Sequence, residues 1–181
     1  PLNSFAAEFA LPFPVRLENP HVIGPDQVWV GVLEKGVTGK KLNSSFKFRD
    51  TPEYKAELGN TVASVARLVP DGMLVFFPSY HTLTCAVESW KETGQWARIT
   101  ARKHAVIEPR GNADAFTQAV SEYKEYVERG DGAVFFAVCR GKVSEGIDFP
   151  DALGRAVLVT GLPFPPRTDP RIALKRKHLD D

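Results

Sequence analysis

The chain has 181 residues, of which 43% are hydrophobic and 25% are charged, and its formal net charge is only +1. This length suits one sizeable domain with its own core and is short for two. The nearly balanced charge gives no overall electrostatic sign of a nucleic-acid partner, so any such binding must come from local patches. No apolar run reaches the roughly eighteen residues of a membrane span, so we expect no membrane partner.

The two cysteines, Cys85 and Cys139, lie far apart in the sequence, and no zinc or cluster-ligand spacing occurs. We therefore expect no metal site in this segment and two reduced, buried thiols of an intracellular protein. The chain starts at Pro1 and stops at Asp181 within a predicted helix, so we expect a segment of a longer protein.

The first part of the chain predicts a short helix, an extended connection and a strand. Leu2, Phe5 and Phe9 have helical spacing, and the prolines that follow stop any longer helix. The β-forming run over residues 28–33 predicts the first strand. Residues 34–49 then carry five cations against one carboxylate. This surplus could contact phosphates or could equally be a solvated loop.

Gly36–Lys41 contains two glycines and two lysines, but the sequence excludes a Walker A phosphate loop there. Such a loop needs four residues between its glycines and a Ser or Thr after the lysine. This stretch has two residues between Gly36 and Gly39, and a second lysine follows Lys40. The chain also lacks an Asp-Glu-Ala-His-like metal-ligand motif, and it has no GxGxxG pattern, which argues against a dinucleotide-binding enzyme.

The middle of the chain predicts two helices around a buried strand. Residues 51–69 have amphipathic periodicity, with Thr51 as N-cap and Pro52 at the first helical position. A buried strand over 73–77 follows, and then a helix from Ser79 to about Trp90. A strand, a turn and a helix in this order form a natural anion site at the start of the helix. The alternative, that Ser79 is a simple helix cap, explains the residue equally well.

The second half repeats this alternation, with strands over 104–107, 133–138 and 155–160, an amphipathic helix over 113–129, and a basic helix from Asp169. The run over 133–138 is apolar throughout, as in a central strand buried on both faces of a parallel sheet. Alternating strands and helices predict an α/β fold with right-handed crossovers, in which a mostly parallel sheet carries helices on both faces.

The stretch from Cys139 to Asp148 (CRGKVSEGID) is the first candidate for the functional surface. It follows the predicted central strand and holds two glycines, two cations, a hydroxyl and two carboxylates in ten residues. Polar groups just beyond the carboxyl end of a buried strand are where open α/β sheets bind ligands. The alternative is a polar turn whose charges are only solvated.

Several motifs resemble those of the XPD-like superfamily 2 iron–sulfur DNA helicases. FFPSY at residues 76–80 is similar to motif IV, and GKVSEGIDF at 141–149 is similar to motif V. VTGLPFPPRTDPR at 159–171 resembles the segment after motif V in the branch that contains FANCJ and the regulator of telomere elongation helicase. The opening PLNSF resembles the residues after motif III, so the resemblance covers essentially the whole chain.

The resemblance implies the second RecA-like (P-loop NTPase type) motor lobe of such a helicase. Residues 1–27 would be the connection after motif III, and 28–181 the lobe itself, truncated before motif VI. ATP and Mg²⁺ would be shared with a missing first lobe, which would also carry the 4Fe–4S cluster. The fragment alone would be inactive, because phosphoryl transfer needs the phosphate cradle, the metal and usually an arginine together.

The resemblance also implies partners and site residues. We expect single-stranded and forked DNA and the first helicase lobe as partners, possible DNA repair or replication proteins, and a nuclear location. The residues assigned to catalysis are Glu145 and Asp148, and those assigned to ATP are Gly146 and Asp148. The residues assigned to DNA are Ser79, Tyr80, Arg140, Gly141, Lys142 and Ser144.

A second hypothesis is a non-catalytic α/β domain that binds nucleic acid or protein, because a fold alone does not determine function. Such a domain needs only the apolar positions, whereas the polar residues of both motifs are also present. The motifs leave open whether the family member acts in crosslink repair or in telomere maintenance.

Overall fold

The computed structural model describes residues 2–20, 22–165 and 169–180, and for Glu145 it describes the backbone only. The chain divides into two compact units, residues 1–32 and 33–181. In the first unit, α1 (Leu2–Phe9) confirms the predicted short helix. The assignment of residues 1–27 to a connection after motif III stays a prediction. Pro1, residues 166–168 of the predicted segment after motif V, and Asp181 lie outside the described residues.

The second unit is built on a four-stranded sheet whose strands are all parallel. It consists of β1 (Gly72–Phe77), β2 (His104–Ile107), β3 (Ala133–Val138) and β4 (Ala156–Val159), in the order β2-β3-β1-β4. Every residue of β3 is buried, which confirms the predicted central strand. Parallel strands need crossover connections, and helices provide them here.

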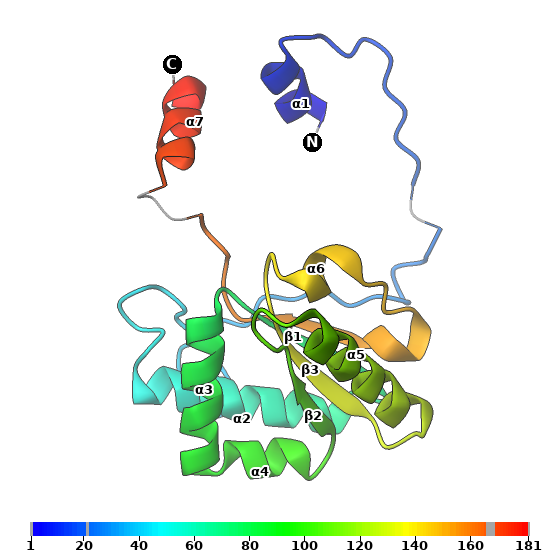
Figure 1. The fold of residues 1–181 in the computed structure, drawn as a ribbon, viewed down its shortest axis with the longest axis vertical. Helices are drawn as coiled ribbons and strands as arrows, with labels where there is room; N and C mark the ends of the chain where they lie inside the picture. The colour runs from blue at the N-terminus through cyan, green and yellow to red at the C-terminus, as the bar shows by residue number, and fades with distance from the viewer. Residues whose placement is uncertain (1, 21, 166–168, 181) are drawn as a thin grey trace. The chain divides into compact units, whose positions relative to one another are not determined.

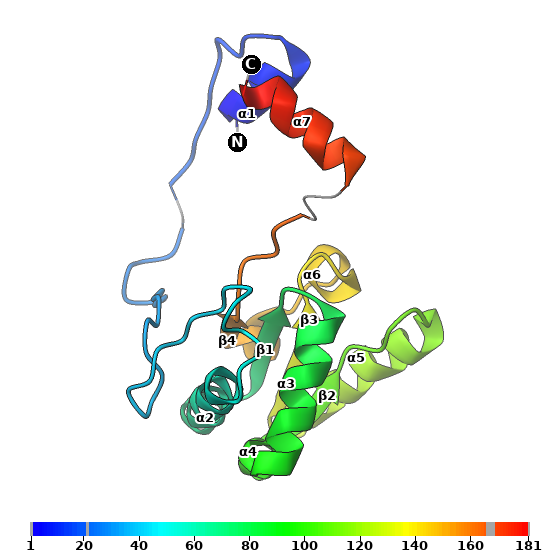
Figure 2. The same cartoon turned by 90° about the vertical axis from the view of Figure 1, so that its left-hand side faces the viewer.

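Helices cover both faces of this sheet, as predicted (Figures 1 and 2). One core contains side chains of α2 (Pro52–Leu68), α3 (Tyr80–Thr93) and α4 (Gln95–Thr100) together with alternate residues of β1 and β3. The other core contains side chains of α5 (Ala113–Glu128) and the remaining residues of those strands, and Ala152 and Leu153 of the short 3-10 helix η1 (Asp151–Gly154) pack against it. Successive strand residues point to opposite faces, so each central strand contributes to both cores. The fold is that of a RecA-like α/β lobe.

The predicted start of α2 is confirmed, and α5 begins at a cap that was not predicted. The Thr51 side chain accepts the N–H of Tyr54, and Pro52 opens α2. Asn112 caps α5 through the N–H groups of Asp114 and Ala115. Side-chain oxygens satisfy donors that have no partner inside the helix, which explains why each helix begins where it does. The predicted basic terminal helix is α7 (Pro170–Asp180).

Three local predictions were wrong or incomplete. Residues 28–33 form no strand, and their large side chains are exposed. High β-propensity favours a strand only where a sheet surface is there to pack on and pair with. The six-residue α4 was not predicted; Gly94, at φ 88°, ends α3 and turns the chain into it. Residues 142–146, predicted as loop, form the short helix α6 (Lys142–Gly146).

None of the helices in the described ranges combines the length and the apolar character that crossing a membrane requires.

Candidate nucleic-acid and nucleotide interface

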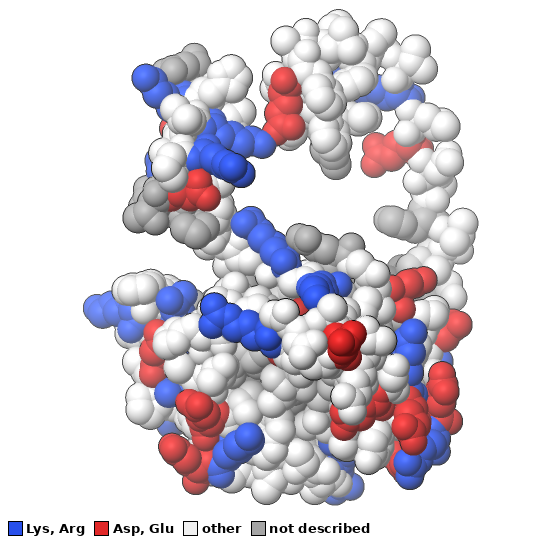
Figure 3. Space-filling view, in the orientation of Figure 1, with Lys and Arg blue, Asp and Glu red and all other residues white. Residues whose placement is uncertain are grey.

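The segments that follow the four strands lie at one edge of the sheet, because parallel strands place all their carboxyl ends there. Ser79 and Tyr80 follow β1, Glu108 follows β2, and the predicted loop of residues 139–148 follows β3. At the end of β4, Thr160 accepts the Tyr54 hydroxyl at 3.0 Å through its carbonyl. Lys and Arg side chains gather over α6 and the adjoining end of α3 (Figure 3). The two segments predicted to bind ligand therefore share one edge.

Glu108 lies beside both of these segments, and the sequence reasoning missed it. Its side chain is only 3% exposed, and its Oε2 accepts the backbone N–H of Val138 at 2.8 Å. Its Oε1 is buried without a hydrogen-bond partner among the described residues. Buried carboxylates are costly unless they are paired, so Glu108 is an unusual feature of this edge. The signal in the sequence was a carboxylate placed directly after a predicted strand and before Pro109.

Tyr80 is half-buried beside the same carboxylate. Burial raises the pKa of the Tyr80 hydroxyl, the Glu108 carboxylate raises it further, and Arg110 partly opposes both. The Arg110 guanidinium lies 5.9 Å from the centroid of the Tyr80 ring. A base that stacked on this ring face would have to displace the arginine or share the ring with it.

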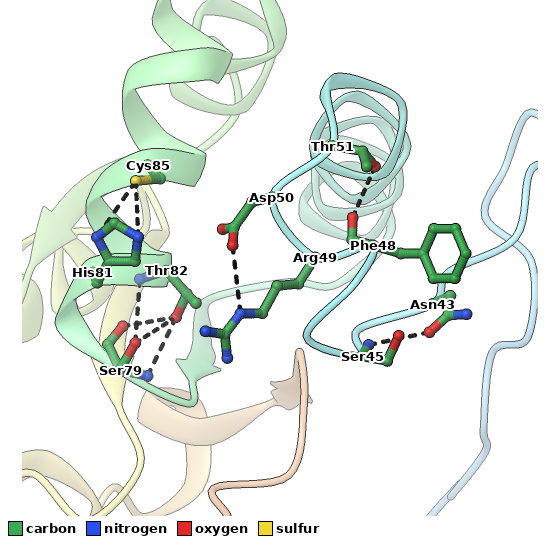
Figure 4. Close-up of polar contacts among 10 residues, drawn as sticks. All are labelled: Asn43, Ser45, Phe48, Arg49, Asp50, Thr51, Ser79, His81, Thr82 and Cys85. Atoms are coloured by element: carbon green, nitrogen blue, oxygen red, sulfur yellow. Dashed lines mark hydrogen bonds and ion pairs between the residues drawn. The ribbon is translucent and has the colours of Figure 1, made fainter.

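Ser79 caps α3 in a full capping box (Figure 4). The N–H of Thr82 donates to Ser79 Oγ at 3.2 Å, and the Ser79 N–H donates to Thr82 Oγ1 at 3.2 Å. The helix-cap explanation is therefore confirmed, and DNA contact by Ser79 stays a prediction. Arg49 extends from the loop before α2 toward this turn, and Arg49 and Thr82 line the same small pocket.

The motif V segment presents its cations at the start of α6. Arg140 is exposed and has a left-handed backbone conformation, with φ 61°. Lys142 is exposed, and its Nζ lies 5.4 Å from the centroid of the Phe116 ring. The Ser144 hydroxyl donates to the carbonyl of Gly141 at 3.0 Å. No carboxylate lies within ion-pairing distance of either cation in the described part of the chain.

Gly141 is the N-cap of α6 and closes a turn against Glu108. Its N–H donates to the carbonyl of Val138 at 3.0 Å. A Cβ at Gly141 would lie 2.7 Å from Glu108 Oε1 and 2.8 Å from the carbonyl oxygen of Val138. Close packing therefore requires a glycine here. The backbone conformation does not, because any residue can adopt its φ of −90°.

The residues predicted to face ATP lie at the other end of α6. Gly146 ends the helix, and nothing lies within 4 Å of the position where a Cβ would stand. The fold thus gives no packing reason for this glycine. Asp148 is exposed in the segment after α6. Glu145 lies within α6, and its side chain falls outside what the structure describes.

The stretch rejected as a Walker A loop is a turn tied to α2. Lys35 and Lys41 form an antiparallel bridge, and the Gly36 N–H donates to the carbonyl of Lys40 at 2.9 Å. The Thr38 N–H donates to Glu57 Oε1 at 2.8 Å. Glu57 is only 1% exposed. Its buried carboxylate accepts a backbone N–H that a phosphate loop would instead donate to its ligand.

The described residues bring together no group of three or more His, Cys, Asp or Glu side chains that could hold a metal ion. Cys85 and Cys139 are free thiols. They are half-buried, which corrects the expectation that both are buried. Cys139 lies just past the end of β3, where the chain leaves the core. Burial raises the pKa of its thiol, with smaller opposing contributions from a backbone hydrogen bond and Arg140.

This raised pKa predicts slow alkylation of Cys139. In a Cys85→Ser variant, the rate of iodoacetamide modification should rise with pH, and its midpoint should lie above the ordinary thiol pKa, because only the thiolate reacts. The rate is measured by mass spectrometry and compared with that of a short cysteine peptide. A midpoint at or below the peptide's would mean that Arg140 outweighs burial.

A comparison with protein families matches residues 62–181 to the model described as the helicase C-terminal domain. The match covers both motif segments, all four strands and the buried Glu108. The chain belongs to the helicase C-terminal domain family. This confirms the family that the motifs at residues 76–80 and 141–149 indicated.

Curated relatives of this helicase C-terminal domain agree. The chain is 51% identical to the regulator of telomere elongation helicase 1 homolog of Oryza sativa subsp. japonica and 50% identical to that of Drosophila persimilis, over 99% of its length in both cases. It is 49% identical, over its whole length, to the homolog of Arabidopsis thaliana. The chain spans about a fifth of the length of these relatives (18–19%).

Proposed function

We propose that this chain is the second motor lobe of an ATP-dependent DNA helicase that acts in genome maintenance. The observation that carries the proposal is the meeting of the motif IV and motif V segments at one edge of the sheet, where Glu108 lies beside both. The family match and relatives that are named telomere elongation helicases support it. The same names favour telomere maintenance over crosslink repair.

Within this lobe, the two ends of α6 would contact different ligands. Arg140 and Lys142 stand at its start, where their exposed cations and the Ser144 region would contact the phosphates of single-stranded DNA. Gly146 and Asp148 stand at its end, where the open space over Gly146 leaves room for a nucleotide. Glu145 and Asp148 would order groups around the ATP phosphates. One short helix would then touch both ligands, so that lobe closure on ATP moves the DNA contact.

Tyr80 and Ser79 would complete the DNA contact from the start of α3. The Arg110 guanidinium already lies over the Tyr80 ring, and Ser79 already caps α3. DNA contact at this turn would therefore use the Tyr80 side chain and the first-turn N–H groups of α3 that the capping box leaves unbonded. Arg49 extends toward the same turn and forms an ion pair with the exposed Asp50 at 3.5 Å, and its guanidinium would reach the DNA backbone beside that carboxylate.

The remaining machinery is assigned to the rest of the helicase. The described residues offer no cluster suited to Mg²⁺ or to a 4Fe–4S centre. In the intact helicase, the first lobe would carry both groups. The chain by itself is expected to lack ATPase activity. Forked DNA, DNA repair or replication proteins and a nuclear location belong to the same proposal for the intact protein.

An Asp148→Asn variant of the intact helicase tests this division. DNA-stimulated ATP hydrolysis should fall by about tenfold or more, because a charged contact made at the reacting nucleotide is lost. Affinity for single-stranded DNA should stay within about twofold. The measurements are steady-state phosphate release and fluorescence anisotropy.

The matched control is Asp131→Asn, which removes an exposed carboxylate before the start of β3 and should leave both quantities unchanged. Equal losses of hydrolysis and DNA affinity in Asp148→Asn would refute the assignment of Asp148 to the nucleotide. Intact protein without any DNA-stimulated hydrolysis would favour the non-catalytic binding domain.

A further inference from the structure

A groove of about 320 Å³ lies between α2 and α4, and the edge described above does not use it. Arg67, Arg98 and Arg102 line it, and its remaining lining residues are small: Ala63, Ser64 and Ala101. The two helices lie side by side in both views of the fold (Figures 1 and 2). Small side chains on facing helices leave the concavity open, and the arginines surround it.

The positive charge in this groove is only partly balanced by the groups around it. No carboxylate lies within 4 Å of any of the three guanidiniums in the described part of the chain, whereas Arg129 and Arg155 elsewhere form ion pairs with aspartates. Arg98 donates to the Asn60 side-chain oxygen at 2.7 Å, which orients the guanidinium and neutralises nothing. Arg67 and Arg98 lie in the last turns of their helices. The partial negative charge at a helix C-terminus balances only part of the three positive charges.

The groove and the candidate interface lie at opposite edges of the sheet. α2 leads into the start of β1, and α4 leads into the start of β2. The arginines stand in the last turns of these helices or just after α4, so the groove belongs to the amino edge of the strands. The motif IV and motif V segments follow the carboxyl ends. A ligand in the groove would therefore leave the proposed DNA contact free.

The lining chemistry favours a peptide over a nucleic acid. Surfaces for single-stranded nucleic acid combine a cationic track with aromatic rings on which bases stack, and no aromatic residue lines this groove. Converging guanidiniums in a compact concavity are the recognised means of holding clustered carboxylates or a phosphate on a peptide, because each guanidinium offers a planar pair of donors. Arginine suits such contacts better than lysine does.

We infer that the α2–α4 groove, lined by Arg67, Arg98 and Arg102, is a docking site for an acidic linear peptide segment of a partner protein. The segment presents clustered carboxylates or a phosphorylated side chain to the guanidiniums. This inference does not depend on the proposed helicase function, because it uses a different surface and a different ligand.

Fluorescence anisotropy with the full chain tests it, using labelled octaglutamate, octaglutamine, and a glutamine-based peptide with one phosphoserine. Octaglutamate should bind in a salt-sensitive way, and octaglutamine should not bind. The double variant Arg67→Gln/Arg102→Gln should weaken octaglutamate binding by about tenfold, because two of three guanidiniums are lost. Arg98 is kept because it bonds to Asn60. Tighter binding of the phosphoserine peptide than of octaglutamate would identify phosphate as the preferred anion.

The matched control is Lys124→Gln/Arg129→Gln, on α5 and at its C-cap, which removes the same charge from the opposite face of the sheet and should change binding by less than about twofold. Circular dichroism melting checks that both variants fold. The inference is overturned if octaglutamate and the phosphoserine peptide both fail to bind, or if the two double variants weaken peptide binding equally. It is also overturned if the arginine variant loses affinity for an oligothymidylate in parallel, because the groove would then be a nucleic-acid surface.

Discussion

Replacing Gly141 by alanine is expected to destabilise the lobe by about 1–3 kcal/mol, which is large for the addition of one methyl group. The new Cβ would stand 2.8 Å from the carbonyl oxygen of Val138 and 2.7 Å from Glu108 Oε1. The carbonyl belongs to the end of β3 and cannot rotate away, and Glu108 is held by its bond to the Val138 N–H. The turn into α6 must therefore shift, and urea unfolding followed by circular dichroism would report the loss.

Gly146→Ala is the control in the same short helix. Nothing lies within 4 Å of the position of its Cβ, and its backbone is not left-handed. Alanine there should be neutral or stabilising by about 0.5–1 kcal/mol, because glycine is a poor helix residue. If Gly146→Ala keeps its stability but impairs ATP hydrolysis in the intact helicase, the glycine is needed for the nucleotide. If Gly141→Ala is as stable as wild type, the close packing described for the turn is wrong.

Trp90→Ala should cost about 3–5 kcal/mol, a substantial part of the 5–15 kcal/mol that typically stabilises a domain. Trp90 is fully buried and packs against Phe77 and Phe136, with ring centroids 6.1 and 5.9 Å away. Its indole Nε1 donates to the carbonyl of Lys55 at 2.7 Å. The substitution removes a large apolar volume and the indole hydrogen bond to the Lys55 carbonyl of α2. Urea unfolding midpoints measure the effect.

Trp29→Ala provides the comparison for Trp90, because its side chain is 79% exposed. It should change the unfolding free energy by less than about 0.5 kcal/mol, as expected for an exposed position. A Trp90→Ala variant within 1 kcal/mol of wild type would contradict the place given to Trp90, at the centre of the core between α3 and the sheet.

The sequence predicted the sheet and its helices well because their signals are local. The apolar run of β3 is buried along its whole length, and Thr51 and Ser79 cap their helices as expected. Strand burial, helix periodicity and capping each depend on residues within a few positions of one another. The motif segments were placed at one sheet edge for a similar reason, since parallel topology brings all the carboxyl ends together.

What the sequence could not predict depends on residues far apart in the chain. Residues 28–33 have the propensity of a strand but find no partner edge, and propensity cannot supply one. Glu108 matters because its side chain reaches Val138, thirty residues further on. The groove of Arg67, Arg98 and Arg102 exists only once α2 and α4 pack together, and α4 itself was too short to recognise.

DNA contact by the motif V segment is tested by single-stranded DNA binding of this chain across a salt series, with wild type beside an Arg140→Ala/Lys142→Ala variant. The control is Arg67→Gln/Arg102→Gln, which removes the same charge at the opposite edge of the sheet. We expect salt-sensitive binding in wild type and control. In the Arg140→Ala/Lys142→Ala variant we expect clearly weaker binding, with a salt slope shallower by about one to two units. Binding that the Arg140→Ala/Lys142→Ala variant leaves unchanged would contradict the placement of DNA on the motif V segment.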